Sequence, residues 1–160
     1  ACRLGWHLFP GYVDFKGRQE VRTLTATFST LSRDLNPHAK GNRWPKITAT
    51  KDAKDEAKLE GERAGREKFG FYRQSLFKKA KVSITLYADT KLARARKCYV
   101  PSDVQNLIAA VKPHIDGLKD AGWVADDSSH YITGFDPVTI LKGKDAGGKC
   151  ALVITFTEVE

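Results

Sequence analysis

The segment Ser102–Gly122 constrains the fold most, because its apolar side chains recur with the period of about 3.6 residues typical of an α-helix. Six aliphatic residues form this stripe: Val104, Leu107, Ile108, Val111, Ile115 and Leu118. A helix with one apolar face buries it against another layer of structure. Ser102 as N-cap, with Gln105 three residues later, predicts a capping box, and Gly122 predicts the end of the helix. Pro113 predicts a kink.

Strand patterns supply that second layer. The alternation in Val21–Thr30 predicts a strand that buries Leu24, Ala26 and Phe28. Further strands are predicted at Ala80–Tyr87, Tyr131–Thr139 and Cys150–Val159, with a weaker one at Tyr12–Phe15. We expect Lys142–Lys149 to join the last two strands as a hairpin.

A second helix is predicted over Thr48–Phe69, which is rich in Ala, Lys and Glu, although Gly61 and Gly65 should weaken it. Residues 31–47 and Asp89–Pro101 predict loops. The elements together indicate an α+β fold, in which a small mixed β-sheet of about four strands packs with two main helices. We expect a single domain over residues 21–160, preceded by an N-terminal extension, residues 1–20, of unassigned role.

The basic residues are concentrated in the front part of the chain. The net charge is +8; residues 1–102 hold 22 basic and 10 acidic side chains, whereas residues 103–160 hold 5 and 9. A basic surface indicates a polyanionic partner. Within the predicted loop Asp89–Pro101, four cations are expected to bind phosphate groups: Lys91, Arg94, Arg96 and Lys97.

Cysteine, histidine and hydropathy patterns argue against several classes of protein. Three cysteines without a CxxC pair disfavour a disulfide scaffold or a zinc site and favour a reduced, cytoplasmic setting. Four histidines show no metal-ligand spacing, so we interpret them as ordinary surface or core residues. No apolar run approaches roughly 18 residues, so no transmembrane helix and no membrane partner are expected.

Three acidic residues flank the predicted helix. Asp103 lies at its start, directly after the basic segment, and Asp126 and Asp127 follow its end. Aspartates are common in turns and at helix ends, which is one interpretation. The other is a Mg²⁺ site, because one or two carboxylates together with phosphate oxygens hold Mg²⁺, which can activate water for phosphodiester hydrolysis. The residues alone leave both interpretations open.

A longer pattern around these aspartates carries a family resemblance. It consists of Asp103-Val104-Gln105-Asn106-Leu107, Val111-Lys112, Ile115-Asp116-Gly117-Leu118, Asp120-Ala121-Gly122 and Asp126-Asp127. In sequence and spacing it resembles the RusA-type Holliday junction resolvases, whose pattern is an Asp-x-Asp-Asn-Leu start, a lysine, Asp-Gly-Leu, Ala-Gly and a closing Asp-Asp. The gapless part covers about 25 residues, and weaker similarity extends over roughly residues 24–158.

The resemblance implies an endonuclease that cuts branched DNA such as a four-way junction, acts as a homodimer and depends on Mg²⁺, with Mn²⁺ as a substitute. It implies a RusA-like fold and a bacterial or phage-infected host cell. Asp103 and Asp127 would be catalytic and bind metal, Asp126 would be a further ligand, and Lys112 stands where the family has its functional lysine. The resemblance also implies DNA contacts from three polar residues: Asn36, Arg43 and Asn106.

One position departs from the pattern, since Gln105 stands where the family has its second aspartate. A glutamine oxygen can ligate Mg²⁺, but it is neutral, so metal binding should be weaker or depend more on Asp126 and Asp127. Alternatively, Gln105 only completes the capping box. Gln105 therefore leaves open a non-catalytic protein that binds branched DNA with a decayed metal site. The basic composition by itself also leaves open an RNA-binding domain, although no RRM or KH motif supports it.

Helix length raises a second question. A straight helix from Asp103 to Gly122 would be about 28 Å long, which would separate Asp103 from Asp127. Three arrangements would reunite them: an extended Asp103, a chain that folds back after Gly122, or a site shared between two subunits. We expect the chain to fold back, and the shared site stays open.

Overall fold

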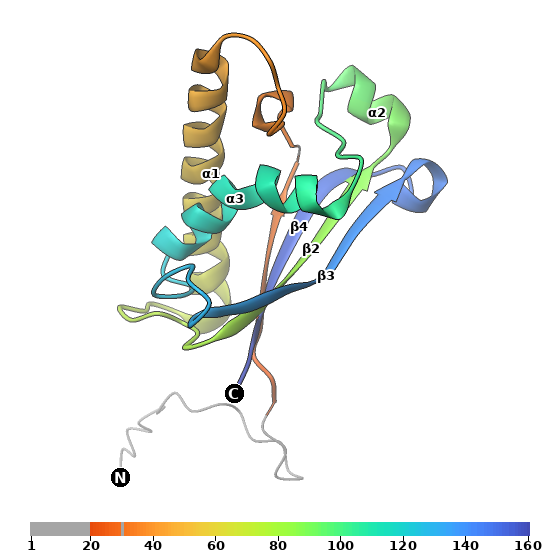
Figure 1. Ribbon diagram of the computed structural model, residues 1–160. Coiled ribbons are helices and arrows are strands. Elements are labelled where there is room, and N and C mark those ends of the chain that lie inside the picture. The colour runs from red at the N-terminus through yellow and green to blue at the C-terminus, as the bar shows by residue number, and fades with distance from the viewer. Residues whose placement is uncertain (1–19, 30) are drawn as a thin grey trace, which may run out of the picture.

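The computed structural model of the protein describes residues 20–29 and 31–160. Along the chain, its elements are β1 (Thr23–Phe28), the 3-10 turn η1 (Arg33–Leu35), α1 (Arg43–Phe69), β2 (Ala80–Ala88), α2 (Thr90–Ala95), α3 (Val104–Asp120), β3 (Ile132–Lys142), the 3-10 turn η2 (Gly143–Ala146) and β4 (Cys150–Glu158). The strands form one mixed sheet in the order β1-β4-β2-β3, and α1 and α3 pack on one of its faces (Figure 1). The predicted α+β fold is confirmed. The predicted strand Tyr12–Phe15 lies outside the described residues.

Alternation along the strands builds the core. In β1, Leu24, Ala26 and Phe28 are buried as predicted, and the threonines between them are exposed. The same alternation in β2 and β4 places the remaining core side chains of the sheet beneath the helices: Val82, Ile84, Leu86, Leu152, Ile154 and Phe156. On the opposite face the hydroxyl oxygens of Thr25 and Thr155 lie 2.9 Å apart across β1 and β4.

The predicted hairpin between the last two strands is wrong. Both β3 and β4 pair with β2, β3 in parallel and β4 antiparallel, so β2 lies between them. The reason is that β2 carries fully buried residues along its length, and its backbone needs a partner on each side. The connection through η2 therefore crosses the end of β2, where the Asp89 N–H donates to the Lys149 carbonyl at 2.9 Å.

Small residues let α1 and α3 approach closely. The buried face of α1 consists of Ala53, Ala57, Gly61, Ala64 and Gly65. A Cβ atom at Gly61 would lie 2.8 Å from the Ala121 Cβ, and the Gly61 carbonyl accepts a 2.9 Å hydrogen bond from the Trp123 indole. The two glycines that should weaken this helix thus lie at its buried, close-packed face. α1 also begins five residues earlier than predicted, at Arg43, because the Asn42 side chain caps it by accepting the Trp44 N–H.

The ends of α3 differ from the prediction. Its N-cap is Asp103, not Ser102, so no Ser102–Gln105 capping box forms. Asp103 has extended backbone angles, φ −144° and ψ 168°, and its carboxylate accepts the Asn106 N–H. The helix continues through Pro113 to Asp120. Gly122 follows the C-cap Ala121 with a φ of +88°, a conformation that glycine adopts without strain.

The predicted loop Asp89–Pro101 contains a helix, α2. Asp89 starts α2, because its carboxylate accepts the N–H groups of Lys91 and Leu92 at 3.1 Å each. Cys98 and Cys150 are both free thiols, with sulfur atoms 3.5 Å apart. Within residues 20–29 and 31–160, no helix has the length and apolarity that crossing a bilayer requires.

Candidate functional site

Polar side chains from two distant segments meet at the start of α3. Both carboxylate oxygens of Asp103 accept hydrogen bonds from Asn106, from its backbone at 2.8 Å and from its side-chain amide at 3.2 Å. The Asn106 Oδ1 lies 3.0 Å from His38 Nε2, and the His38 N–H donates to the Asn36 side chain at 2.9 Å. The fold therefore links two residues of the predicted polar loop to the start of the motif helix.

The negative charge of Asp103 affects the pKa of Tyr99. Burial raises the pKa of its phenol, and the negative charge of Asp103 raises that pKa further. The Tyr99 N–H also donates to the Leu31 carbonyl at 2.7 Å, which ties the segment after α2 to the chain before η1. Asp103 thus lies where the segment after α2 meets residues 31–38, which are far from it in the sequence.

The closing aspartates meet α3 further along. Lys112 forms ion pairs with Asp127 and with Asp116, the second at 2.9 Å. Asp126 is exposed, and its carboxylate accepts the Asp127 N–H at 2.9 Å, which fixes the turn. The chain after Gly122 therefore folds back far enough to place Asp127 on Lys112. Asp116 belongs to the motif, but the sequence did not single it out as a site residue.

These two positions are separate within one chain. Lys112 stands nine positions after Asp103, which corresponds to about 13.5 Å along the helix axis and about half a turn around it. Among the described residues, no group of three or more His, Cys, Asp or Glu side chains is placed to hold a metal ion. Carboxylates have the right chemistry for Mg²⁺. One chain nevertheless does not assemble Asp103, Asp126 and Asp127 into the single site that the sequence predicted.

Gln105, the neutral residue of the motif, lies on the same side of α3 as Lys112. Gln105 is exposed and stands seven residues before Lys112, which is close to two helical turns.

The predicted phosphate-binding cations all lie on the surface. Lys91 and Arg94 are on α2, while Arg96 and Lys97 follow it, and each is exposed. Lys97 adopts a φ of +52°, so the chain turns sharply before it runs through Cys98 to Asp103. Arg43 is also exposed, as the first residue of α1 rather than part of a loop.

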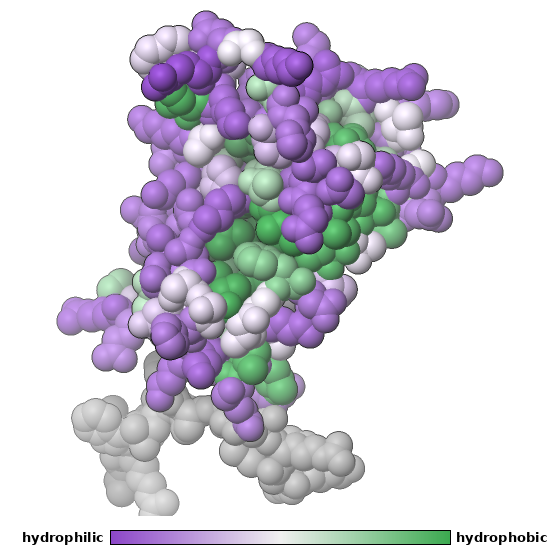
Figure 2. Space-filling model, in the orientation of Figure 1, coloured by the Kyte–Doolittle hydropathy of each residue, from purple (hydrophilic) through white to green (hydrophobic). Residues whose placement is uncertain are grey.

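An apolar surface adjoins this site. Figure 2 shows hydrophobic side chains gathered over the seam between α3 and β3. They include Val104, which is 41% exposed, and the partly buried Ile108, Val138 and Ile140. Because β3 is an edge strand, its outer side has no neighbouring strand in the described part of the chain. Val104 directly follows Asp103, so this surface reaches the candidate site.

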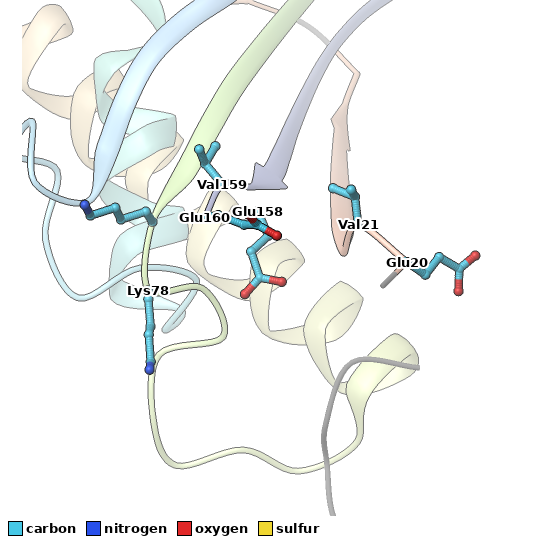
Figure 3. Close-up of a pocket in the computed structure, with 7 residues that line it drawn as sticks. Glu20, Val21, Lys78, Glu158, Val159 and Glu160 are labelled. Carbon is cyan, nitrogen blue, oxygen red and sulfur yellow. The ribbon is translucent and has the colours of Figure 1, made fainter. Parts of the chain in front are cut away.

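A pocket with charged residues lies at the end of the sheet where β1 and β2 begin and β4 ends. Figure 3 shows an open pocket there, lined by residues that carry charges of both signs: Glu20, Val21, Lys78, Lys79, Glu158, Val159 and Glu160. Glu158 is engaged by Arg22, whose hydrogen bonds lower the pKa of the carboxyl. No residue predicted for catalysis or DNA binding lies in this pocket.

His38 is not among the residues predicted for the site, although its ring contacts Asn106. Its position within Asn36-Pro37-His38, in the polar loop of the resemblance, was the available signal. No pattern in the sequence could show that this loop reaches Asn106, because 68 residues separate His38 from Asn106.

Compared with models of known protein families and with curated proteins, the chain matches none.

Proposed function

We propose that this protein is a structure-selective endonuclease that cuts branched DNA by phosphodiester hydrolysis, as a Mg²⁺-dependent homodimer in which Mn²⁺ can substitute. The ion pair between Lys112 and Asp127 carries the proposal. The resemblance assigns these residues to one active site, and the fold brings them into contact although fifteen positions separate them. The proposed setting is the cytoplasm of a bacterial or phage-infected cell.

Metal binding, charge stabilisation and DNA binding are assigned to different side chains. Mg²⁺, when bound, supplies charge neutralisation and an activated water. The side chains that would hold it are Asp103, Asp126 and Asp127, with Gln105 as a neutral addition. Lys112, held between two carboxylates, stabilises the negative charge that develops on the phosphate. The exposed cations of α2 and the segment after it hold the DNA backbone.

A dimer would complete the site. Because Asp103 and Asp127 are apart in one chain, we propose that Asp103 of one subunit acts with Asp127 of the partner subunit. The apolar seam between α3 and β3, next to Asp103, supports such a contact. A two-fold symmetric dimer also suits a four-way junction, since it presents two equivalent sites to opposed strands.

A second candidate is a non-catalytic protein that binds branched DNA. The neutral Gln105 and the separation of the carboxylates in one chain favour it. This candidate keeps the same cationic surface and predicts tight binding of a junction without metal-dependent cutting.

Cleavage of synthetic DNA separates the two candidates. We expect the protein to nick a four-way junction in Mg²⁺ or Mn²⁺ in preference to flap, splayed and linear DNA. The variant Asp127→Asn should lose about 100-fold or more of this activity while it still binds the junction. Asp145→Asn, an exposed substitution in η2, is the matched control and should cut normally. Binding without cutting at either metal would select the second candidate, and neither binding nor cutting would contradict both.

A further inference from the structure

A small cavity opens beside α2, at the end of the sheet where β2 stops. Its volume is about 300 Å³. Small and apolar side chains form its floor: Ala88, Ala93, Cys98 and Val100. The polar side chains that line it are Thr90, Arg33, Arg94 and Lys142.

Three separate elements deliver the three cations. Arg33 is in η1, Arg94 is in α2 and Lys142 ends β3. Backbone pairing holds them together, because Ser32 forms an isolated β-bridge with Cys98, and Ala88 at the end of β2 is in register with Lys142. The cluster is therefore a product of the tertiary structure. Of the three cations, the sequence had singled out only Arg94.

None of the three cations forms an ion pair with a described residue, whereas Arg22, Lys54 and Lys81 elsewhere on the molecule do. The nearby carboxylate of Asp89 accepts two backbone N–H groups at the start of α2. Like charges around one small cavity repel each other, and a bound anion would remove that repulsion. Guanidinium, ammonium and hydroxyl donors together match the several acceptor oxygens of a phosphate group.

We infer that this cavity binds one phosphate group of a DNA strand. The inference rests on the proposed function in that DNA is the source of the phosphate; the chemistry of the cavity itself requires only a phosphate oxyanion. Val100 lines the cavity, and Asp103 follows three residues later, so the two Cα atoms are at most about 11 Å apart. A strand held here passes the start of α3.

The salt dependence of junction binding tests the DNA source. The double variant R33A/K142A removes two exposed cations, and circular dichroism checks that it folds. We expect it to bind a four-way junction about tenfold more weakly at fixed salt. The slope of log affinity against log salt should become shallower by about 1, the value for one lost phosphate contact. The control K78A/K79A removes the same charge at the opposite end of the sheet and should keep the wild-type slope.

Titration with inorganic phosphate tests the cavity without DNA. The amide resonances of Ala93, Cys98 and Val100 should shift in the wild-type protein and stay fixed in R33A/K142A. If the wild-type protein binds no junction but these amides still shift, the proposed function fails, while the cavity stands as a site for free phosphate. If junction binding keeps its slope in R33A/K142A and phosphate moves none of these amides, the inference is overturned.

Discussion

His114 shows what burial does to a titratable side chain. Its side chain is 1% exposed on α3, its ring centroid lies 4.8 Å from that of Phe28, and its Nδ1 has no hydrogen-bond partner among the described residues. Burial lowers its pKa from 6.5 to about 4, because the charged imidazolium loses its hydration. The folded protein therefore holds His114 neutral.

This gives stability a defined pH dependence. The unfolded chain takes up the proton near pH 6.5 and the folded chain only near pH 4, so protons favour the unfolded chain in this range. The contribution of His114 to the free energy of unfolding is therefore largest above pH 6.5 and decreases as the pH falls toward 4. The difference between the two pKa values corresponds to a loss of roughly 3 kcal/mol in the free energy of unfolding. In His114→Leu we expect urea unfolding to show a flatter dependence between pH 7 and pH 4.5.

The exposed His130 supplies the control for this prediction. His130→Leu should retain the wild-type loss of stability between pH 7 and pH 4.5, because folding leaves this side chain exposed to water. An equal acid destabilisation in His114→Leu would show that another group is responsible. Glu158 titrates at lower pH, since Arg22 holds its pKa below the ordinary value.

The contact between α1 and α3 depends on the absence of a side chain at Gly117. A Cβ atom at Gly117 would collide with the Lys54 carbonyl and lie 2.6 Å from the Ala57 Cβ. The colliding Lys54 atom is backbone of α1, so a larger residue must push the two helices apart. Glycine is needed at position 117 because α1 and α3 approach closely there, and not because the backbone adopts an unusual conformation.

Gly117→Ala should therefore destabilise the protein, although alanine normally favours a helix. We expect a loss of about 1–3 kcal/mol in the free energy of unfolding, the usual cost of overpacking. Gly134→Ala is the matched comparison, because a Cβ there meets nothing within 4 Å, and it should change stability far less. Urea denaturation measures both, and equal stability of the two variants would argue against a tight α1–α3 contact.

Elements were predictable from the sequence where neighbouring residues determine them, and not where the choice depends on the folded chain. The strands β1, β2 and β4 and the helix α3 were predictable because a period of two or of about 3.6 in burial is written in consecutive residues. The short α2 was not, because its start depends on Asp89, a residue that serves equally well in a turn. The N-cap of α3 likewise required a choice between Ser102 and Asp103, both good caps, which only the folded backbone made.

In the assembled protein, the Asp103 and Asp127 of one site belong either to one subunit or to two. Mixing Asp103→Asn subunits with Asp127→Asn subunits gives a direct answer. In a heterodimer with shared sites, one site regains both aspartates, so an equal mixture should recover about one quarter of the wild-type nicks.

Each variant taken alone through the same unfolding and remixing should stay inactive, which controls for contamination. No recovery in the mixture, with heterodimers demonstrated by mass, would mean that each subunit builds its own site. The chain after Gly122 would then have to move Asp127 from Lys112 toward Asp103.

Local sequence was sufficient to predict the α+β class, the apolar faces of β1, β2 and α3, the charge asymmetry and the candidate residues, because periodicity and composition act over a few neighbouring positions. Four features depend on the folded chain: β2 separates β3 from β4, His38 reaches Asn106, Lys112 pairs with Asp127 while Asp103 stands apart, and Arg33, Arg94 and Lys142 share one cavity. Such contacts form between distant segments and depend on which buried faces pack together. That choice is made by the whole core at once and is not written in any local stretch of the chain.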